Sequence, residues 1–120
     1  MIRTCDALGR EVVLATPARR VVSLVPSETE SVAVLAGPDR LVGRTSYCEE
    51  PASIEHVPVV GGTKRVDVDA VLGLAPDLVL ANQEENGRRD VERLIEAGIT
   101  VHVSFPRTVA ESIAYLRALV

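Results

Sequence analysis

Residues 20–30 read RVVSLVPSETE, and this stretch decides the fold. Its first half is apolar and rich in valine, whose β-branched side chain favours strands, and an all-apolar run suits a strand covered on both faces. Ser27 and Glu30 then have the spacing of a capping box, in which the Ser27 hydroxyl accepts a hydrogen bond from the Glu30 N–H. The pattern predicts a buried strand followed by a helix over residues 27–36, which ends at Gly37-Pro38.

Three other short apolar runs are similar to the first and are also predicted to be strands. They are residues 40–43, 77–81 and 99–103. The predicted helices that follow are residues 67–74, 85–97 and 108–120. Asp67 can cap the first of these helices, and Thr108 with Glu111 repeats the capping box at the last. Alternating strands and helices imply right-handed crossovers, so the sequence predicts a three-layer α/β/α Rossmann-like fold with a mostly parallel central sheet.

The N-terminal segment predicts a β-hairpin. Residues 2–4 and 11–14 flank the turn-rich residues 6–10, so we expect two antiparallel strands at the edge of the sheet, peripheral to the core. A length of 120 residues fits one domain, and no internal repeat or long linker divides the chain. Residues 1–120 are therefore interpreted as a single α/β domain.

Composition and charge exclude several classes of protein. The net charge is −4 and the Lys and Arg residues are scattered, so there is no basic face for phosphates, and nucleic acid is not an expected partner. No apolar run approaches the ~20 residues that span a bilayer, and the N-terminus lacks the zones of a signal peptide. As written, the chain is predicted to be soluble and unexported. Cys5 and Cys48 are interpreted as two buried or idle thiols, the alternative being a disulfide in an exported protein.

A search for catalytic residues finds little. His56 and His102 lie far apart, and His102 stands within an apolar run, which is typical of a core or sheet-end histidine. No HExxH, GxSxG or P-loop motif occurs, and residues 61–64 contain only part of a phosphate loop. We therefore expect no catalytic residue, no metal site and no intrinsic cofactor, and the protein is not predicted to be an enzyme.

Loops at the carboxyl ends of the strands are the better candidates, because ligands of open α/β sheets bind there. These loops are residues 25–28, 44–51, 61–66, 82–87 and 104–106. Tyr47 is conspicuous as an aromatic residue in a polar loop of a chain with only three aromatics, although it could instead pack on Pro51 or an adjoining helix. From these loops the candidate ligand-binding residues are Tyr47, Ser27, Glu28, Gly62 and Gln83.

Five segments of the chain follow the order and spacing of a known family. They are residues 20–30, 41–47, 59–62, 74–81 and 94–101. Together they resemble the N-terminal lobe of class III periplasmic binding proteins, the cobalamin, haem and iron-siderophore receptors of ABC importers, and they are most similar to the cobalamin-binding branch. The resemblance covers about residues 3–120. It implies that residues 108–120 begin the helix that joins the two lobes.

The resemblance also implies a function and a location. It implies a substrate-binding component that holds a metal chelate, such as cobalamin, haem or a ferric siderophore, between two lobes, of which this chain supplies the first. It implies a periplasmic or other extracytoplasmic location, while the lack of a signal peptide leaves a cytoplasmic location open. The alternative is a cytosolic tetrapyrrole- or metal-handling protein or enzyme on the same half-fold.

Two residues receive roles from the resemblance. Tyr47 falls where the cobalamin receptor contacts its ligand with a tyrosine and where several haem receptors ligate iron. Its phenol can stack on a corrin, or coordinate a ferric ion as phenolate with help from Arg44 or Arg65. Asp69 falls where the family pairs an acidic residue with arginines of the ABC permease, and Asp67 is the competing position.

A lone lobe would also leave apolar surface uncovered. The helix predicted over residues 108–120 carries an apolar stripe of Ile113, Leu116 and Leu119 or Val120, whose packing partners would lie elsewhere. Soluble monomers rarely expose large apolar patches. A homodimer through the exposed lobe surface is therefore expected, because one patch can serve both partners.

Overall fold

Four parallel strands form the central sheet of the computed structural model, which describes residues 1–48, 52–105 and 109–120. The strands are β3 (Val21–Ser23), β4 (Leu41–Arg44), β5 (Leu78–Asn82) and β6 (Val101–Ser104). They lie in the order β4-β3-β5-β6, and each neighbouring pair is parallel. The four apolar runs are thus confirmed as the strands of a parallel sheet.

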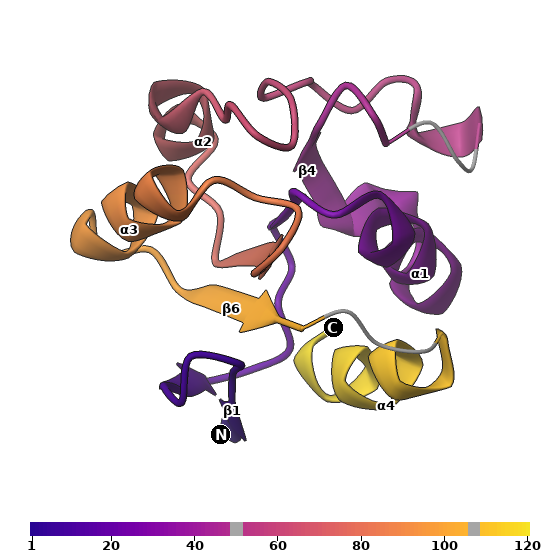
Figure 1. Ribbon diagram of the computed structural model, residues 1–120. Helices are drawn as coiled ribbons and strands as arrows, with labels where there is room; N and C mark the ends of the chain where they lie inside the picture. The colour runs from indigo at the N-terminus through magenta and orange to yellow at the C-terminus, as the bar shows by residue number, and fades with distance from the viewer. Residues whose placement is uncertain (49–51, 106–108) are drawn as a thin grey trace.

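Helices cover both faces of this sheet (Figure 1). They are α1 (Pro26–Ala36), α2 (Val68–Gly73), α3 (Arg88–Glu96) and α4 (Val109–Leu119), with single 3-10 turns at Pro38–Arg40 and Ala52–Ile54. Side chains of α1 and α4 pack in one core cluster, and those of α2 and α3 pack in the other. The three-layer α/β/α fold is therefore confirmed.

Strand β5 shows why the sequence produces two core clusters. All five of its residues are buried. Leu78 and Leu80 belong to the cluster under α1 and α4, whereas Val79 and Ala81 belong to the cluster under α2 and α3. Successive side chains of a strand point to opposite faces, so an apolar run without alternation supplies both clusters at once.

The strand order places a topological switch point between β3 and β5. From β3 the chain crosses through α1 to β4 on one side, and from β4 it crosses through α2 to β5 on the other side of β3. In open α/β sheets, ligands bind in the crevice at such a point, outside the carboxyl ends of the strands. The loops after β3 and β5 are therefore the first place to look for a site.

The N-terminal hairpin is present, as β1 (Ile2–Cys5) paired antiparallel with β2 (Glu11–Leu14). Its turn covers the free edge of β6: the Ala7 N–H donates to the Val103 carbonyl at 2.7 Å, and Arg10 Nη2 donates to the Val101 carbonyl at 2.8 Å. The expectation that the hairpin is peripheral to the core is wrong, because alternation along β2 buries Val12 and Leu14.

Two predicted helix starts differ from the structure. Helix α1 begins at Pro26 with Val25 as N-cap, and no side chain caps it, so the Ser27 capping box is wrong. Proline suits the first helical turn because it lacks an N–H and has a fixed φ, which places Ser27 inside that turn.

Helix α3 begins at Arg88 rather than near residue 85, because the Asn82 side chain folds residues 84 and 85 into a turn. The predicted Asp67 cap of α2 is confirmed by its bond from the Ala70 N–H, and the Thr108 cap lies outside the described residues.

Helix α4 packs on the core of this chain. Leu116 and Leu119 are fully buried in the cluster that also contains side chains of α1. The Ala18 N–H donates to the Leu119 carbonyl at 2.7 Å, and Arg40 Nη1 donates to the Ala18 carbonyl at 2.8 Å. The expectation of an uncovered apolar stripe is therefore wrong, and the homodimer inferred from it loses its main support.

Candidate functional site

We call the rim the set of described segments at the carboxyl ends of the strands. It consists of residues 25–28, which include the first turn of α1, and of residues 45–48, 61–66 and 82–87 with Phe105. Buried polar side chains gather beneath it, and three of them are the last residues of β3, β5 and β6. These buried side chains are Ser23, Glu28, Thr29, Thr45, Asn82, Asn86 and Ser104. Buried polar groups must be hydrogen-bonded to be tolerated, so their partners determine how the rim is built.

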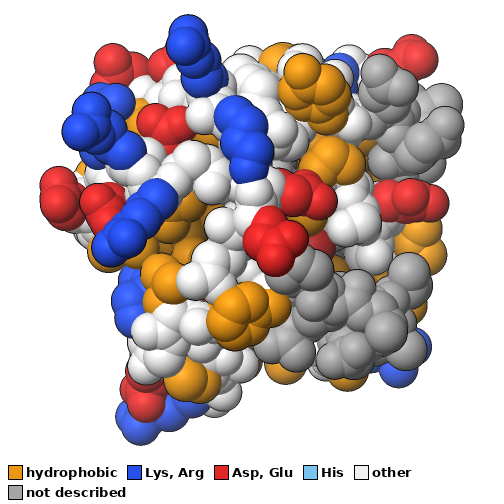
Figure 2. Space-filling view, viewed as in Figure 1, with side chains coloured by type: hydrophobic (Ala, Val, Ile, Leu, Met, Phe, Trp, Pro, Cys, Tyr) orange, Lys and Arg blue, Asp and Glu red, His pale blue; other side chains and the backbone are white. Residues whose placement is uncertain are grey.

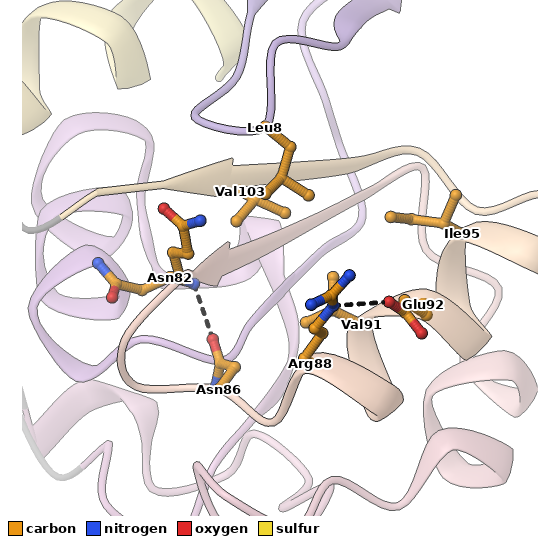
Figure 3. A pocket seen from close by; sticks show the side chains of 9 residues that line it. Leu8, Asn82, Asn86, Arg88, Val91, Glu92, Ile95 and Val103 are labelled. Carbon is orange, nitrogen blue, oxygen red and sulfur yellow. Dashed lines mark hydrogen bonds and ion pairs between the residues drawn. The ribbon is translucent and has the colours of Figure 1, made fainter.

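Two asparagines build the loop that follows β5. Asn82 Oδ1 accepts from the N–H groups of Glu84 at 2.9 Å and Glu85 at 3.2 Å. Asn86 Oδ1 accepts from the Asn82 N–H at 2.8 Å, the bond drawn between these residues in Figure 3. The loop is thus closed on itself, and the side chain of Gln83 is exposed on the rim.

Glu28 lies below the surface of the rim. Its side chain is buried, and the Ser104 hydroxyl lies 3.0 Å from Glu28 Oε1 and 3.2 Å from the Ala81 carbonyl. Asn82 Nδ2 lies 3.4 Å from the same hydroxyl. The carboxylate therefore links the start of α1 to the end of β6, and the Ser104 hydroxyl in turn contacts the end of β5, while neighbouring Ser27 is exposed.

Tyr47 projects from the loop after β4. Its side chain is 65% exposed, and a Cβ added at Gly62 would lie 3.5 Å from Tyr47 Cε2, so the ring flanks Gly62. The Ser46 N–H donates to the Gly61 carbonyl at 2.9 Å, which joins the two loops. The structure therefore brings together two of the sequence-predicted residues. The alternative contact of Tyr47 with Pro51 lies outside the described residues.

A buried thiol supports the base of the Tyr47 loop. Cys48 Sγ lies 3.0 Å from Thr29 Oγ1 and 3.1 Å from Thr45 Oγ1. Thr45 Oγ1 also accepts from the Tyr47 N–H at 3.3 Å. Cys48 is buried and Cys5 is exposed, and both are free thiols. These contacts fix the backbone from which the Tyr47 ring projects.

Arg44 holds the segment that follows this loop. Its Nη1 donates to the Cys48 carbonyl at 2.8 Å, and its Nε donates to the Val57 carbonyl at 3.0 Å. The guanidinium therefore binds backbone carbonyls at both ends of the segment. Arg65, the other cation suggested as a helper of Tyr47, is exposed in the loop at residues 61–66.

The loop at residues 61–66 turns tightly at Gly61. Its φ is +105°, and an added Cβ would lie 2.6 Å from the Arg65 carbonyl oxygen, so only glycine fits there. The Gly62 N–H donates to that same carbonyl at 3.0 Å. Lys64 Nζ donates to the Glu84 carbonyl in the neighbouring loop. The turn thereby sets Gly62 beside Tyr47.

Beside the rim, a cavity of about 330 Å³ opens between α3, β6 and the hairpin turn. Figure 3 shows Leu8 of that turn above Val103, with the side chains of α3 below them. The cavity is lined by Leu8, Asn82, Gln83, Asn86, Arg88, Val91, Glu92, Ile95 and Val103. Of the sequence-predicted residues, only Gln83 lines it.

Sequence reasoning did not single out Asn82, Asn86 and Ser104. The only sign of them in the sequence is that they are polar residues at or just after the end of an apolar run. Polar side chains at such positions can hydrogen-bond to backbone groups of a turn. His102, by contrast, fits the prediction of a core histidine, since it is buried in β6 and its ring stacks on Tyr115 with centroids 4.8 Å apart.

Charged side chains are mixed in sign over the α2 and α3 side of the face in Figure 2. Asp69 is exposed in the first turn of α2, and Asp67 beside it is engaged as the N-cap.

Among the described residues, no three His, Cys, Asp or Glu side chains gather as they would around a metal ion. Within the same part of the chain, no helix is both long and apolar enough to cross a membrane.

Comparison with known proteins identifies relatives of this lobe. The periplasmic binding protein family model matches residues 21–118. A vitamin B12-binding protein of Yersinia pestis (strain Pestoides F) is 35% identical over 92 residues, which cover 77% of this chain and 33% of the relative. The chain thus spans about a third of the length of the curated relatives it matches.

Solved structures show the same fold. The periplasmic vitamin B12 binding protein BtuF of Vibrio cholerae superposes with a TM-score of 0.78 and 28% identity, over 85% of this chain and 41% of that one. A periplasmic haem-binding protein from Pseudomonas aeruginosa superposes with a TM-score of 0.73 and 26% identity, over 82% and 36%. These relatives are binding proteins rather than enzymes. The chain therefore belongs to the periplasmic binding protein family.

Proposed function

We propose that the chain is the first lobe of a substrate-binding protein that captures a metal chelate, with cobalamin as the leading candidate, for an ABC importer. The observation that carries the proposal is Tyr47, a residue that is 65% exposed and whose ring flanks Gly62 at the carboxyl ends of a parallel sheet. This is the edge at which open α/β sheets bind ligands. The relative named as a vitamin B12-binding protein supports the choice of cobalamin.

The rim offers a cobalamin-like ligand both apolar and polar contacts. The Tyr47 ring can stack on a flat macrocycle, and Gly62 beside it has no side chain to compete for that space. Ser27 in the first turn of α1 and Gln83 in the loop after β5 are exposed, so they can exchange hydrogen bonds with amide groups at the ligand's periphery. Glu28 would act from beneath, by holding the end of β6 through Ser104.

Haem is the second candidate, and one observation favours it. The exposed Tyr47 hydroxyl can serve as an axial phenolate ligand to ferric iron, which a corrin does not require. The fold similarity to the haem-binding protein from Pseudomonas aeruginosa supports the same reading. The two candidates therefore differ in whether the Tyr47 oxygen, or only its ring, contacts the ligand.

The same proposal includes a partner and a location. Asp69 is exposed in the first turn of α2, while the Asp67 carboxylate is occupied by the Ala70 N–H. Asp69 is thus the better placed carboxylate to pair with arginines of a permease, a contact that favours encounter rate and register. Such delivery would take place in the periplasm. In this arrangement, residues 108–120 would continue into the helix between the lobes.

Calorimetric and absorbance titrations of the whole 120-residue chain with cyanocobalamin and with haemin test the proposal. One lobe covers one face of a chelate, so we expect micromolar or weaker binding. Tyr47→Ala should abolish binding of either ligand. Tyr47→Phe should preserve cobalamin binding and remove the absorbance band of tyrosine-ligated haem.

Val34→Ala is the matched control, because Val34 is similarly exposed but lies on α1 away from the rim. It should bind as the unsubstituted chain does. Binding of neither ligand by the unsubstituted chain, or equal binding by Tyr47→Ala, contradicts the proposal. Sub-micromolar affinity would contradict the argument that a single lobe grips its ligand weakly.

A further inference from the structure

Asn86 is the side chain in which three rim loops meet. It is buried, and its Nδ2 donates to the Leu24 carbonyl at the end of β3 and to the Thr63 carbonyl, both at 3.0 Å. Its Oδ1 accepts from the Asn82 N–H at 2.8 Å. One amide group therefore joins the loops that follow β3 and β5 and the loop at residues 61–66 across the topological switch point.

The orientation of this amide follows from its partners. Two of the three are carbonyl oxygens, which require donors, and the third is an N–H, which requires an acceptor. An amide supplies two donors and an acceptor in one planar group, and turning it over would set oxygen against both carbonyls. Aspartate keeps the shape but has no proton for the carbonyls, and alanine supplies none of the three bonds. Asparagine is the residue that fits this position.

The loop at residues 61–66 is held against the loop after β5 and against the start of α3 at further points. Lys64 Nζ donates to the Glu84 carbonyl, and Asp90 Oδ2 accepts from the Val66 N–H at 3.0 Å. The two backbones also approach closely, since a Cβ added at Gly87 would lie 3.0 Å from the Lys64 oxygen. Lys64 is exposed, so water can replace its bond, whereas Asn86 is buried and its bonds have no such replacement.

We propose that Asn86 is the positioning residue of the rim, which fixes the loop carrying Gly62, and thereby the flank of the Tyr47 ring, relative to the ends of β3 and β5. It acts through backbone groups and need not touch a ligand itself. Its effect on affinity rests on the proposed function above. Its effect on the loops does not, because all three hydrogen bonds join groups of the chain itself.

The first test is amide hydrogen exchange of the ligand-free chain, comparing Asn86→Ala and Asn86→Asp with Leu94→Ala. Leu94 is fully buried in α3, so its truncation lowers global stability without removing a rim bond. Losing two buried bonds should speed exchange of the Gly62 amide roughly tenfold or more in both Asn86 variants, relative to amides in β5. The backbone N–H of Asn82 should exchange rapidly in Asn86→Ala. It should stay protected in Asn86→Asp, because the aspartate retains an oxygen that accepts from this N–H.

Uniform loss of protection in the Asn86 variants, as in Leu94→Ala, would overturn the proposal. If Asn86→Ala fails to fold, the pattern in Asn86→Asp decides the question. The second test is cyanocobalamin affinity at a temperature where all variants are folded, with an expected loss of roughly tenfold for Asn86→Asp and none for Leu94→Ala. If the unsubstituted chain binds cyanocobalamin and Asn86→Asp binds it equally well, Asn86 does not contribute to affinity. If the unsubstituted chain does not bind, the proposed function is refuted, and the hydrogen-exchange result alone decides whether Asn86 positions the loops.

Discussion

The two ends of the parallel sheet satisfy their polar groups in different ways. At the amino ends, Asp77 accepts from the backbone N–H groups of Arg19 and Arg20, each at 3.0 Å, and Asp77 and Arg20 are both exposed. At the carboxyl ends, the corresponding hydrogen bonds are made by buried side chains such as Asn86 and Ser104. Water can replace an exposed hydrogen bond but cannot reach a buried one. The carboxyl end is thus the rigid platform, and the side chains above it are available to a ligand.

A matched pair of glycines should show this difference most strongly. Gly61 at the carboxyl end and Gly98 at the amino end have φ values of +105° and +87°. Alanine at Gly98 meets no atom within 4 Å, whereas alanine at Gly61 would place its Cβ 2.6 Å from a backbone oxygen. Backbone conformation alone should cost about 1–2 kcal/mol at Gly98, and the added clash should bring the cost at Gly61 to about 3 kcal/mol or more.

Urea denaturation of Gly61→Ala and Gly98→Ala measures both costs, with the slope of each transition as a check on two-state unfolding. The difference between the variants isolates the clash, because both share the strain of a positive φ. Equal losses of stability would mean that the loop at residues 61–66 yields easily. The carboxyl end would then be no more rigid than the amino end.

Polar truncations at the two ends should have the next largest effects. Ser104→Ala removes a hydroxyl 3.0 Å from the buried Glu28 Oε1, so we expect a loss of about 2–3 kcal/mol. Asp77→Ala removes two hydrogen bonds, but its backbone partners lie at the surface, so we expect about 0.5–1.5 kcal/mol. Thermal and urea unfolding of the two variants gives the ranking. A larger loss for Asp77→Ala would reverse the comparison between the ends.

The fold could be predicted from the sequence because its signals are local and repeated. Each strand of the parallel sheet comes from an apolar run, the pattern of a strand that is covered on both faces. Boundaries were harder where two local rules compete. Pro26 at the first helical position took precedence over the Ser27 capping box, and the Asn82 turn delayed the start of α3 to Arg88.

The candidate site could be predicted only in part, because some of its hydrogen bonds join residues that lie far apart in the sequence. Tyr47 stood out because aromatics are rare in the sequence, and the loop positions followed from the strand order. Asn86 bonds to Leu24 and Thr63, which are far from it in sequence, so no local pattern could indicate its role. The burial of Leu116 likewise depends on which face α4 presents to the lobe, which an amphipathic pattern alone does not specify.

Of the substitutions compared at the two ends of the sheet, Tyr47→Ala should have the smallest effect on stability, because the ring lies above the buried hydrogen bonds of the carboxyl end. Its ring is 65% exposed, and the described contacts that shape its loop come from the backbone and from the Thr45 and Cys48 side chains. Tyr47→Ala should therefore change the free energy of unfolding by no more than about 0.5 kcal/mol, the range typical of surface substitutions. Urea denaturation without ligand measures this change. A loss comparable to that of Ser104→Ala would show that Tyr47 belongs to the platform, and reduced ligand affinity in Tyr47→Ala could then no longer be assigned to a lost contact.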